Sequence, residues 1–97
     1  MGVVELVRFR LVAGTDDDAF MQIDKRFETQ FAYRQPGFVR RMLLRADDGA
    51  WVSHVLWSDR SHADAAWALY ATDAHAVARN TVIDMTTVER ELLTGHD

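Results

Sequence analysis

One segment, residues 38–58, restricts the fold of this chain more than any other. Two alternating stretches, residues 38–46 and 51–58, are separated by the sequence Asp47-Asp48-Gly49-Ala50. An Asp-Gly pair between such stretches is a strong short-range signal for a β-hairpin. The segment therefore predicts two antiparallel strands that are neighbours in one sheet.

The register of this hairpin follows from the face on which its apolar residues gather. If Ala46 pairs with Trp51, one face is almost wholly apolar, with only Arg40 out of place. That face would contain Phe38, Met42, Leu44, Trp51, Ser53, Val55 and Trp57. The opposite face would contain Val39, Arg41, Leu43, Arg45, Val52, His54 and Leu56. A shift by one residue would mix the two sets, so we expect this register.

The remaining segments complete an alternating pattern of strands and helices. Residues 3–11 and 85–93 alternate as strands do. Residues 15–33 predict a helix that begins with a Thr15 cap and buries Phe20, Ile23, Phe27 and Phe31. Ser58 or Ser61 caps a second helix, which Thr72-Asp73 interrupts. Its predicted buried stripe is Ala63, Ala66, Trp67, Tyr70, Ala74 and Val77.

The order βαββαβ predicts an α+β fold, a ferredoxin-like sandwich in which two helices cover one face of a four-stranded antiparallel sheet. Residues 1–97 form one domain of this kind. The face without helices carries apolar residues among its arginines, which is too apolar to be left to water. These residues are Leu6, Val39, Leu43, Val52 and Leu56. A second copy of the sheet is the simplest cover, so we expect a homodimer.

Composition excludes several classes of partner and chemistry. The formal net charge is -4, with 15 acidic and 11 basic residues, which argues against a nucleic-acid partner. The chain has no cysteine, which removes disulfides, thiolate nucleophiles and zinc–thiolate sites and is compatible with a cytoplasmic protein. The first ten residues are typical of a strand and not of a signal peptide. No apolar stretch approaches the ~20 residues of a membrane span.

Few residues carry a chemical signal by themselves. The four histidines have no HxxxH or HExxH spacing, so we expect no metal site. His75, at the helix interruption, is a candidate general base because imidazole titrates near neutrality, although a surface histidine would also fit this position. Glu5 shares a strand face with Val7, so its carboxylate must pair, take up a proton or reach solvent at the strand's start. The hydroxyl of Tyr70 on the buried stripe also needs a partner or water.

Four features together resemble a known family over essentially the whole chain. They are the first strand followed by "AGT", the "QPGF" turn, Trp57 closing the third strand, and an alanine-rich helix broken near "TDAH". With these features the chain resembles the antibiotic biosynthesis monooxygenase-like group of the dimeric α+β barrel superfamily. The resemblance implies a back-to-back sheet dimer, with a cavity in each subunit between sheet and helices. Some relatives oxygenate polyketide-type aromatic compounds without a cofactor, and others cleave haem.

The resemblance can be carried over only where residues match. Haem-degrading relatives have an asparagine where this chain has Val7, a helix tryptophan near Trp67, and an iron-ligating histidine near Arg79. The two departures make haem an improbable ligand, so no cofactor is expected. Cofactor-free oxygenases have a tryptophan at Trp57 and an asparagine four residues earlier, where this chain has Ser53. A hydroxyl is a weaker oxyanion donor than an amide.

The expected function is therefore a cofactor-independent monooxygenase, or a binder, of a small flat aromatic compound. The expected catalytic residues are Ser53, Trp57 and His75. The expected substrate-binding residues are Glu5, Val7, Met42, Trp67 and Tyr70. Trp51, Trp57 and Trp67 would line a flat pocket, or all three would be core. The alternative is a non-catalytic dimeric module whose cavity is filled by its own side chains.

Overall fold

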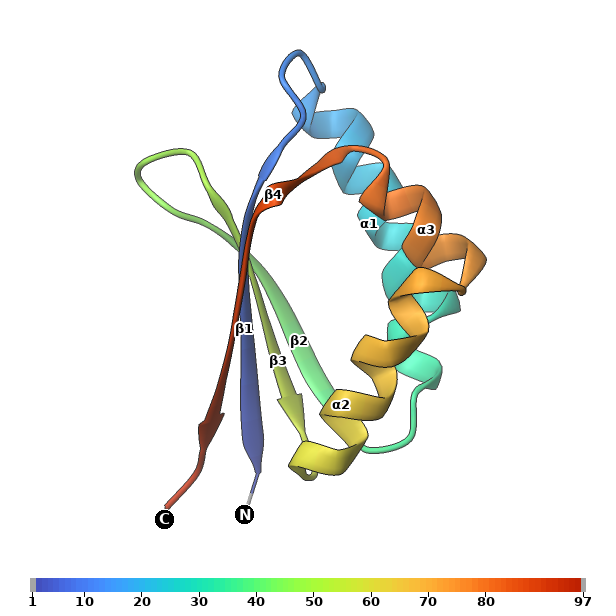
Figure 1. Ribbon diagram of the computed structural model, residues 1–97, viewed down its shortest axis with the longest axis vertical. Coiled ribbons are helices and arrows are strands. Elements are labelled where there is room, and N and C mark those ends of the chain that lie inside the picture. The colour runs from blue at the N-terminus through green and yellow to red at the C-terminus, as the bar shows by residue number, and fades with distance from the viewer. Residues whose placement is uncertain (1, 97) are drawn as a thin grey trace.

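The computed structural model describes residues 2–96 and has a four-stranded antiparallel sheet with the order β2-β3-β1-β4. The strands are β1 (Val3–Leu11), β2 (Phe38–Arg45), β3 (Trp51–Trp57) and β4 (Ile83–Thr94). The helices are α1 (Asp17–Gln30), η1 (Ala32–Arg34), α2 (Arg60–Ala68), η2 (Leu69–Ala71) and α3 (Ala74–Asn80). Within residues 2–96, all helices lie on one side of the sheet, and the other side has none (Figure 1). The predicted ferredoxin-like α+β fold is confirmed.

Aspartates, and not the predicted Thr15 and serines, cap the three α-helices. Asp16 accepts a hydrogen bond from the backbone N–H of Ala19, and Asp59 accepts one from that of His62. Asp73 caps α3, so the predicted interruption of the second helix at Thr72-Asp73 is confirmed. Aspartate satisfies the free N–H groups and also complements the helix dipole. Within residues 2–96, no helix has the length and apolar character to cross a membrane.

The predicted register of the hairpin is wrong by one residue. Arg45, and not Ala46, pairs with Trp51. The turn is one residue shorter than expected, because the backbone of Ala46 bonds to that of Ala50 at 2.8 Å and Gly49 adopts a φ of 88°. Met42 therefore lies on the helix-free face and is 38% exposed, whereas Leu43 faces the helices.

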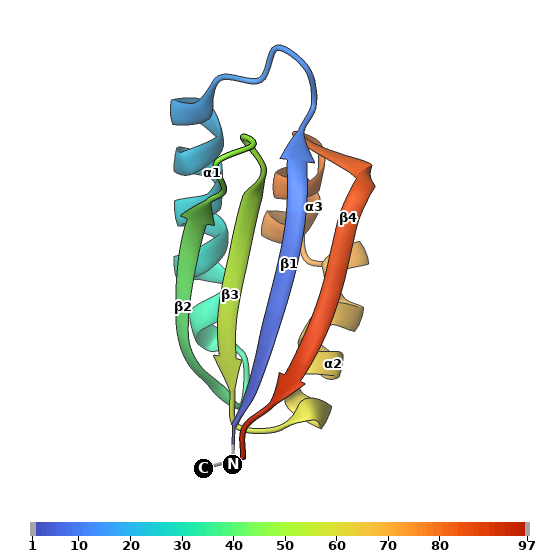
Figure 2. The same ribbon diagram turned by 90° about the vertical axis from the view of Figure 1, so that its left-hand side faces the viewer.

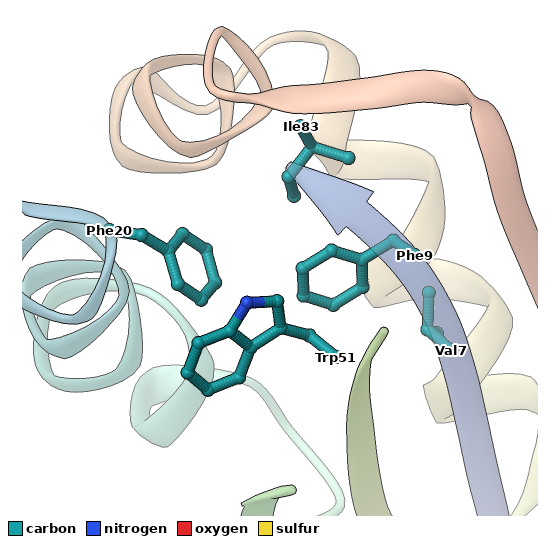
Figure 3. Close-up of a cluster of buried hydrophobic side chains, with 5 residues drawn as sticks. All are labelled: Val7, Phe9, Phe20, Trp51 and Ile83. Carbon is teal, nitrogen blue, oxygen red and sulfur yellow. The ribbon is translucent and has the colours of Figure 1, made fainter. Parts of the chain in front are cut away.

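The core lies between the sheet and the helices. Its first cluster joins both ends of the chain: Val7, Phe9, Phe20, Trp51 and Ile83 (Figure 3). Phe20 of α1 packs edge-on to Phe9 with 5.7 Å between ring centroids and tilted against Trp51 at 5.1 Å. These buried rings hold α1 against the two central strands, β1 and β3.

A large bulge interrupts the pairing of β1 with β4. Arg8 pairs with Glu89 and Arg10 with Asp84, so a single β1 residue, Phe9, is opposite residues 85–88. The hydroxyl of Thr87 takes the place of the missing ladder partner, accepting from the backbone N–H of Arg10 at 2.9 Å. Such bulges bend the bulged strand, and β4 makes a corner near its start (Figure 2).

Candidate functional site

The bulge of β4 borders a cavity of about 240 Å³ between the sheet and the helices that follow β3. β1 and β4 supply one wall, and α2, η2 and α3 supply the other. The lining residues are Val7, Phe9, Trp67, Tyr70, Ala71, Arg79, Asn80, Ile83, Met85 and Val88. Val7, Phe9 and Ile83 also belong to the core cluster, so the floor of the cavity is rigid. Met85 is 54% exposed and marks the mouth.

Three polar side chains interrupt the apolar lining: Tyr70, Arg79 and Asn80. Burial, with a smaller contribution from the charge of Glu5, raises the pKa of Tyr70 to about 12. Its hydroxyl is therefore protonated at neutral pH and can act as a donor. The amide of Asn80 donates to the backbone oxygen of Tyr70 at 3.5 Å, a weak bond that links α3 to η2.

Arg79 is held in an aromatic and acidic setting. Its guanidinium carbon lies 4.9 Å from the ring centroid of Phe9 and 4.8 Å from that of Phe27, and its Nε–H donates to Asp24 at 2.8 Å. Burial lowers the pKa of Arg79, and the charge of Arg41 adds to this effect, whereas Asp24 opposes it. An arginine remains charged in spite of such a shift. A cation therefore lies in a largely apolar lining.

Asp24 links this cation to α1 and β2. Its carboxylate accepts hydrogen bonds from both terminal nitrogens of Arg41, at 2.8 and 2.7 Å, and from Nε of Arg79. Arg41 also donates to Glu28 at 2.9 Å, and its side chain is only 1% exposed. Burial acts to raise the pKa of Asp24, but the hydrogen bonds and charges of the two arginines outweigh burial and lower it. Two carboxylates and two guanidinium groups thus form a balanced buried cluster.

A second buried carboxylate, Glu5, lies on the same sheet face. It accepts from the indole N–H of Trp57 at 3.1 Å and from Nε of Arg90 at 2.6 Å. The guanidinium of Arg90 also bonds to Asp64 at 3.0 Å and lies 4.8 Å from the ring centroid of Trp67. Glu5 is therefore paired and not solvated, and its partner Arg90 packs on a tryptophan that lines the cavity.

The structure brings only some of the predicted site residues to the cavity. Val7, Trp67 and Tyr70 line it. Ser53 and Trp57 are buried on the helix-facing side of β3, and neither belongs to the lining. Trp57 packs edge-on against Phe38, with 5.9 Å between centroids.

Three other predicted residues also lie away from the lining. Glu5 is buried beside Trp57. His75 lies in the first turn of α3 and is partly exposed. Met42 lies on the opposite face of the sheet, because the one-residue change of register turns it away from the helices.

Sequence reasoning missed Arg79 as a member of the site. Asp73 restarts the helix, so α3 buries Ala76 and Arg79 in place of the predicted Ala74 and Val77. One signal could have pointed to it. Asp24 lies between Phe20 and Phe27 on the apolar side of α1, and a buried carboxylate requires a cationic partner.

Comparisons with known proteins give a family for the chain. The sequence matches no protein-family model and no curated protein. Among solved structures, SnoaB, a cofactor-independent oxygenase from Streptomyces nogalater, is 30% identical, with a TM-score of 0.77 over 99% of this chain and 94% of SnoaB.

More distant structures share the fold. The ActVA-Orf6 monooxygenase of Streptomyces coelicolor, solved with the ligand Nanaomycin D, is 16% identical, with a TM-score of 0.75 over 99% of this chain and 88% of that one. Rv0793 from Mycobacterium tuberculosis is also 16% identical, with a TM-score of 0.73 over 100% of this chain and 97% of Rv0793. On its identity to SnoaB across nearly the full length of both proteins, this chain belongs to the antibiotic biosynthesis monooxygenase-like family.

Proposed function

We propose that the protein is a cofactor-independent monooxygenase, or a binder, of a small flat aromatic compound that occupies the cavity. The cavity itself carries this proposal, because its walls are apolar and aromatic and contain only a few polar side chains. The oxygenase activity of SnoaB and the ligand complex of ActVA-Orf6 support it. The volume of about 240 Å³ lies just below the ~300 Å³ at which ligand pockets usually begin, so a compact ligand is expected, with one edge at Met85.

The polar groups suit an electron-rich substrate. Without a cofactor, O₂ must take electrons from the substrate, and a hydroxylated aromatic gives them up most readily after losing a proton. Arg79 and the protonated Tyr70 would stabilise the resulting anion. A ring methylene would then lose two hydrogens and gain one oxygen atom, and the second oxygen atom of O₂ would leave as water.

A second candidate function is ligand binding without turnover. Within residues 2–96, the lining contains no carboxylate and no imidazole that could take the substrate's proton. Tyr70, with a pKa of about 12, is a donor and not a base at neutral pH. A cavity that is not filled by side chains favours this function over a purely structural module.

A panel of anthrones, quinols and flavonoids, titrated under air, tests both candidates. Quenching of tryptophan fluorescence together with oxygen uptake would support the oxygenase. Quenching without uptake would support the binder. The absence of quenching by every compound would contradict both.

We also propose that the protein is a homodimer that pairs its helix-free sheet faces. This face carries apolar side chains from β1, β2, β3 and β4: Val4, Leu6, Val39, Met42, Leu44, Val52, Leu56 and Leu93. Arg8 lies opposite Glu89 on it, so the face carries both signs of charge and can be complementary to a copy of itself across a twofold axis. The Nδ1 atom of His54 is also buried there without a protein partner. Light scattering should give about twice the 11.1 kDa of one chain, and a clean monomer would contradict the proposal.

A further inference from the structure

Arg79 combines two properties that are seldom found together. Its side chain is 5% exposed, yet it lines the cavity. The Nε–H is bonded to Asp24, and within residues 2–96 neither terminal nitrogen of Arg79 is bonded to another side chain or to the backbone. The guanidinium is fixed between the rings of Phe9 and Phe27. The free donors of a buried cation are therefore the part of Arg79 that can meet a ligand.

Asp24 sets the direction of this guanidinium without touching the cavity. It lies on α1 and bonds to Arg79 of α3 and Arg41 of β2. Arg41 donates two hydrogen bonds to Asp24 and a third to Glu28. The carboxylate of Asp24 therefore has little freedom to move. Because Asp24 is bonded to Nε, the donors of the terminal nitrogens remain available.

We propose that the cavity selects aromatic ligands that carry an ionised oxygen conjugated to the ring, and that Asp24 is the positioning residue that directs Arg79 toward that oxygen. This proposal rests on the proposed function and specifies its ligand class. Tyr70, protonated at neutral pH, is a second donor in the same lining. A neutral analogue of the same shape would lack the attraction between opposite charges, which is stronger in a buried site than in water.

Two naphthoquinones test the selection. 2-Hydroxy-1,4-naphthoquinone is ionised at neutral pH, and its 2-methoxy analogue is neutral. By calorimetry, the wild-type protein should bind the ionised compound about tenfold more tightly, because only this compound forms an ion pair with Arg79. Equal affinities would overturn this proposal and leave the proposed function in place. Binding of neither compound would overturn both.

The role of Asp24 requires a variant that keeps the local charge constant. Asp24→Leu/Arg41→Met removes one charge of each sign, and exchange of a buried ion pair for apolar residues is often tolerated. The ratio of affinities should fall toward one, while the affinity for the neutral compound changes little. A purely structural role would lower both affinities together, and that result, or an unchanged ratio, would overturn the positioning role.

An exposed ion pair between the same helix and strand supplies the matched control. Asp17 of α1 bonds to Arg45 of β2 at 2.9 Å, and both side chains are about half exposed. Asp17→Leu/Arg45→Met should leave the ratio at its wild-type value. If the Asp24→Leu/Arg41→Met protein does not fold, Asp24→Glu moves the carboxylate by one methylene and must lower the ratio. A wild-type ratio in Asp24→Glu would then overturn the role.

Discussion

The indole N–H of Trp57 donates to Oε1 of Glu5 over 3.1 Å, although 52 positions separate the two residues in the chain. Both side chains are almost completely buried. The resemblance implied a site role for Trp57, but here its polar atom satisfies a buried carboxylate and its ring packs among Phe38, Ala63 and Ala66. The geometry therefore favours a contribution to stability.

Trp57→Phe should lower the free energy of unfolding by about 1–3 kcal/mol, because Glu5 loses a buried donor and the smaller ring leaves a void. Urea denaturation measures this loss. Binding of an aromatic ligand should persist in the folded variant. Loss of binding with unchanged stability would instead make Trp57 a site residue.

Trp67→Phe should have the opposite profile, because Trp67 lines the cavity. The smaller ring should weaken ligand binding by about 0.5–1.5 kcal/mol of stacking energy. Fluorescence of the remaining tryptophans, or calorimetry, measures the affinity. Trp57→Phe is the matched control, and equal effects of the two substitutions on affinity would contradict the placement of the cavity.

Two neighbouring residues of β2 test the corrected register. Met42→Asp places a charge on the helix-free face and should give a folded monomer. Leu43 packs against the first core cluster, so Leu43→Asp should unfold the chain, since a buried unpaired carboxylate costs several kcal/mol. Light scattering and circular dichroism separate the two results. A folded Leu43→Asp protein would support the register expected from the sequence.

Acid should weaken the fold through Asp24. The arginines lower the pKa of Asp24 in the folded protein below the ordinary value of 3.8, so the contribution is complete above that value and is lost as the pH falls toward the lowered pKa. Unfolding free energies measured between about pH 6 and pH 3 should therefore decline more steeply for the wild type than for Asp24→Leu/Arg41→Met. Parallel curves would show that Asp24 contributes nothing to this dependence.

The fold could be predicted because strand-like and helix-like patterns of apolar residues alternate along the chain and each is recognisable locally. The strands, the break at Thr72-Asp73 and the Asp-Gly hairpin are all visible in short windows. The register of the hairpin was not predictable in this way. Gathering the apolar residues of the hairpin on one face placed Arg41 on the helix-free face. Arg41 can be buried beneath the helices because it pairs with Asp24 and Glu28, which are 17 and 13 residues away in the chain. Compensation over that distance has no signal in the hairpin itself.

The candidate site was predictable to a similar extent. Val7, Trp67 and Tyr70 follow from strand and helix faces that continue without interruption. Arg79 follows an interruption, and the new cap at Asp73 changes which residues of α3 turn inward. A single periodic stripe drawn through both helical pieces therefore misses Arg79, the one cation that lines the cavity within residues 2–96.

The corner in β4 has a consequence for how this protein can diversify. Residues 85–88 have no ladder partners on β1, and the side chain of Met85 at the mouth is largely exposed. The aromatic core that holds α1 to the sheet lies on the far side of Phe9. Substitutions at the mouth can therefore alter the size of the accepted ring system while the buried aromatic core is left untouched, and new specificities can be acquired without loss of a stable protein.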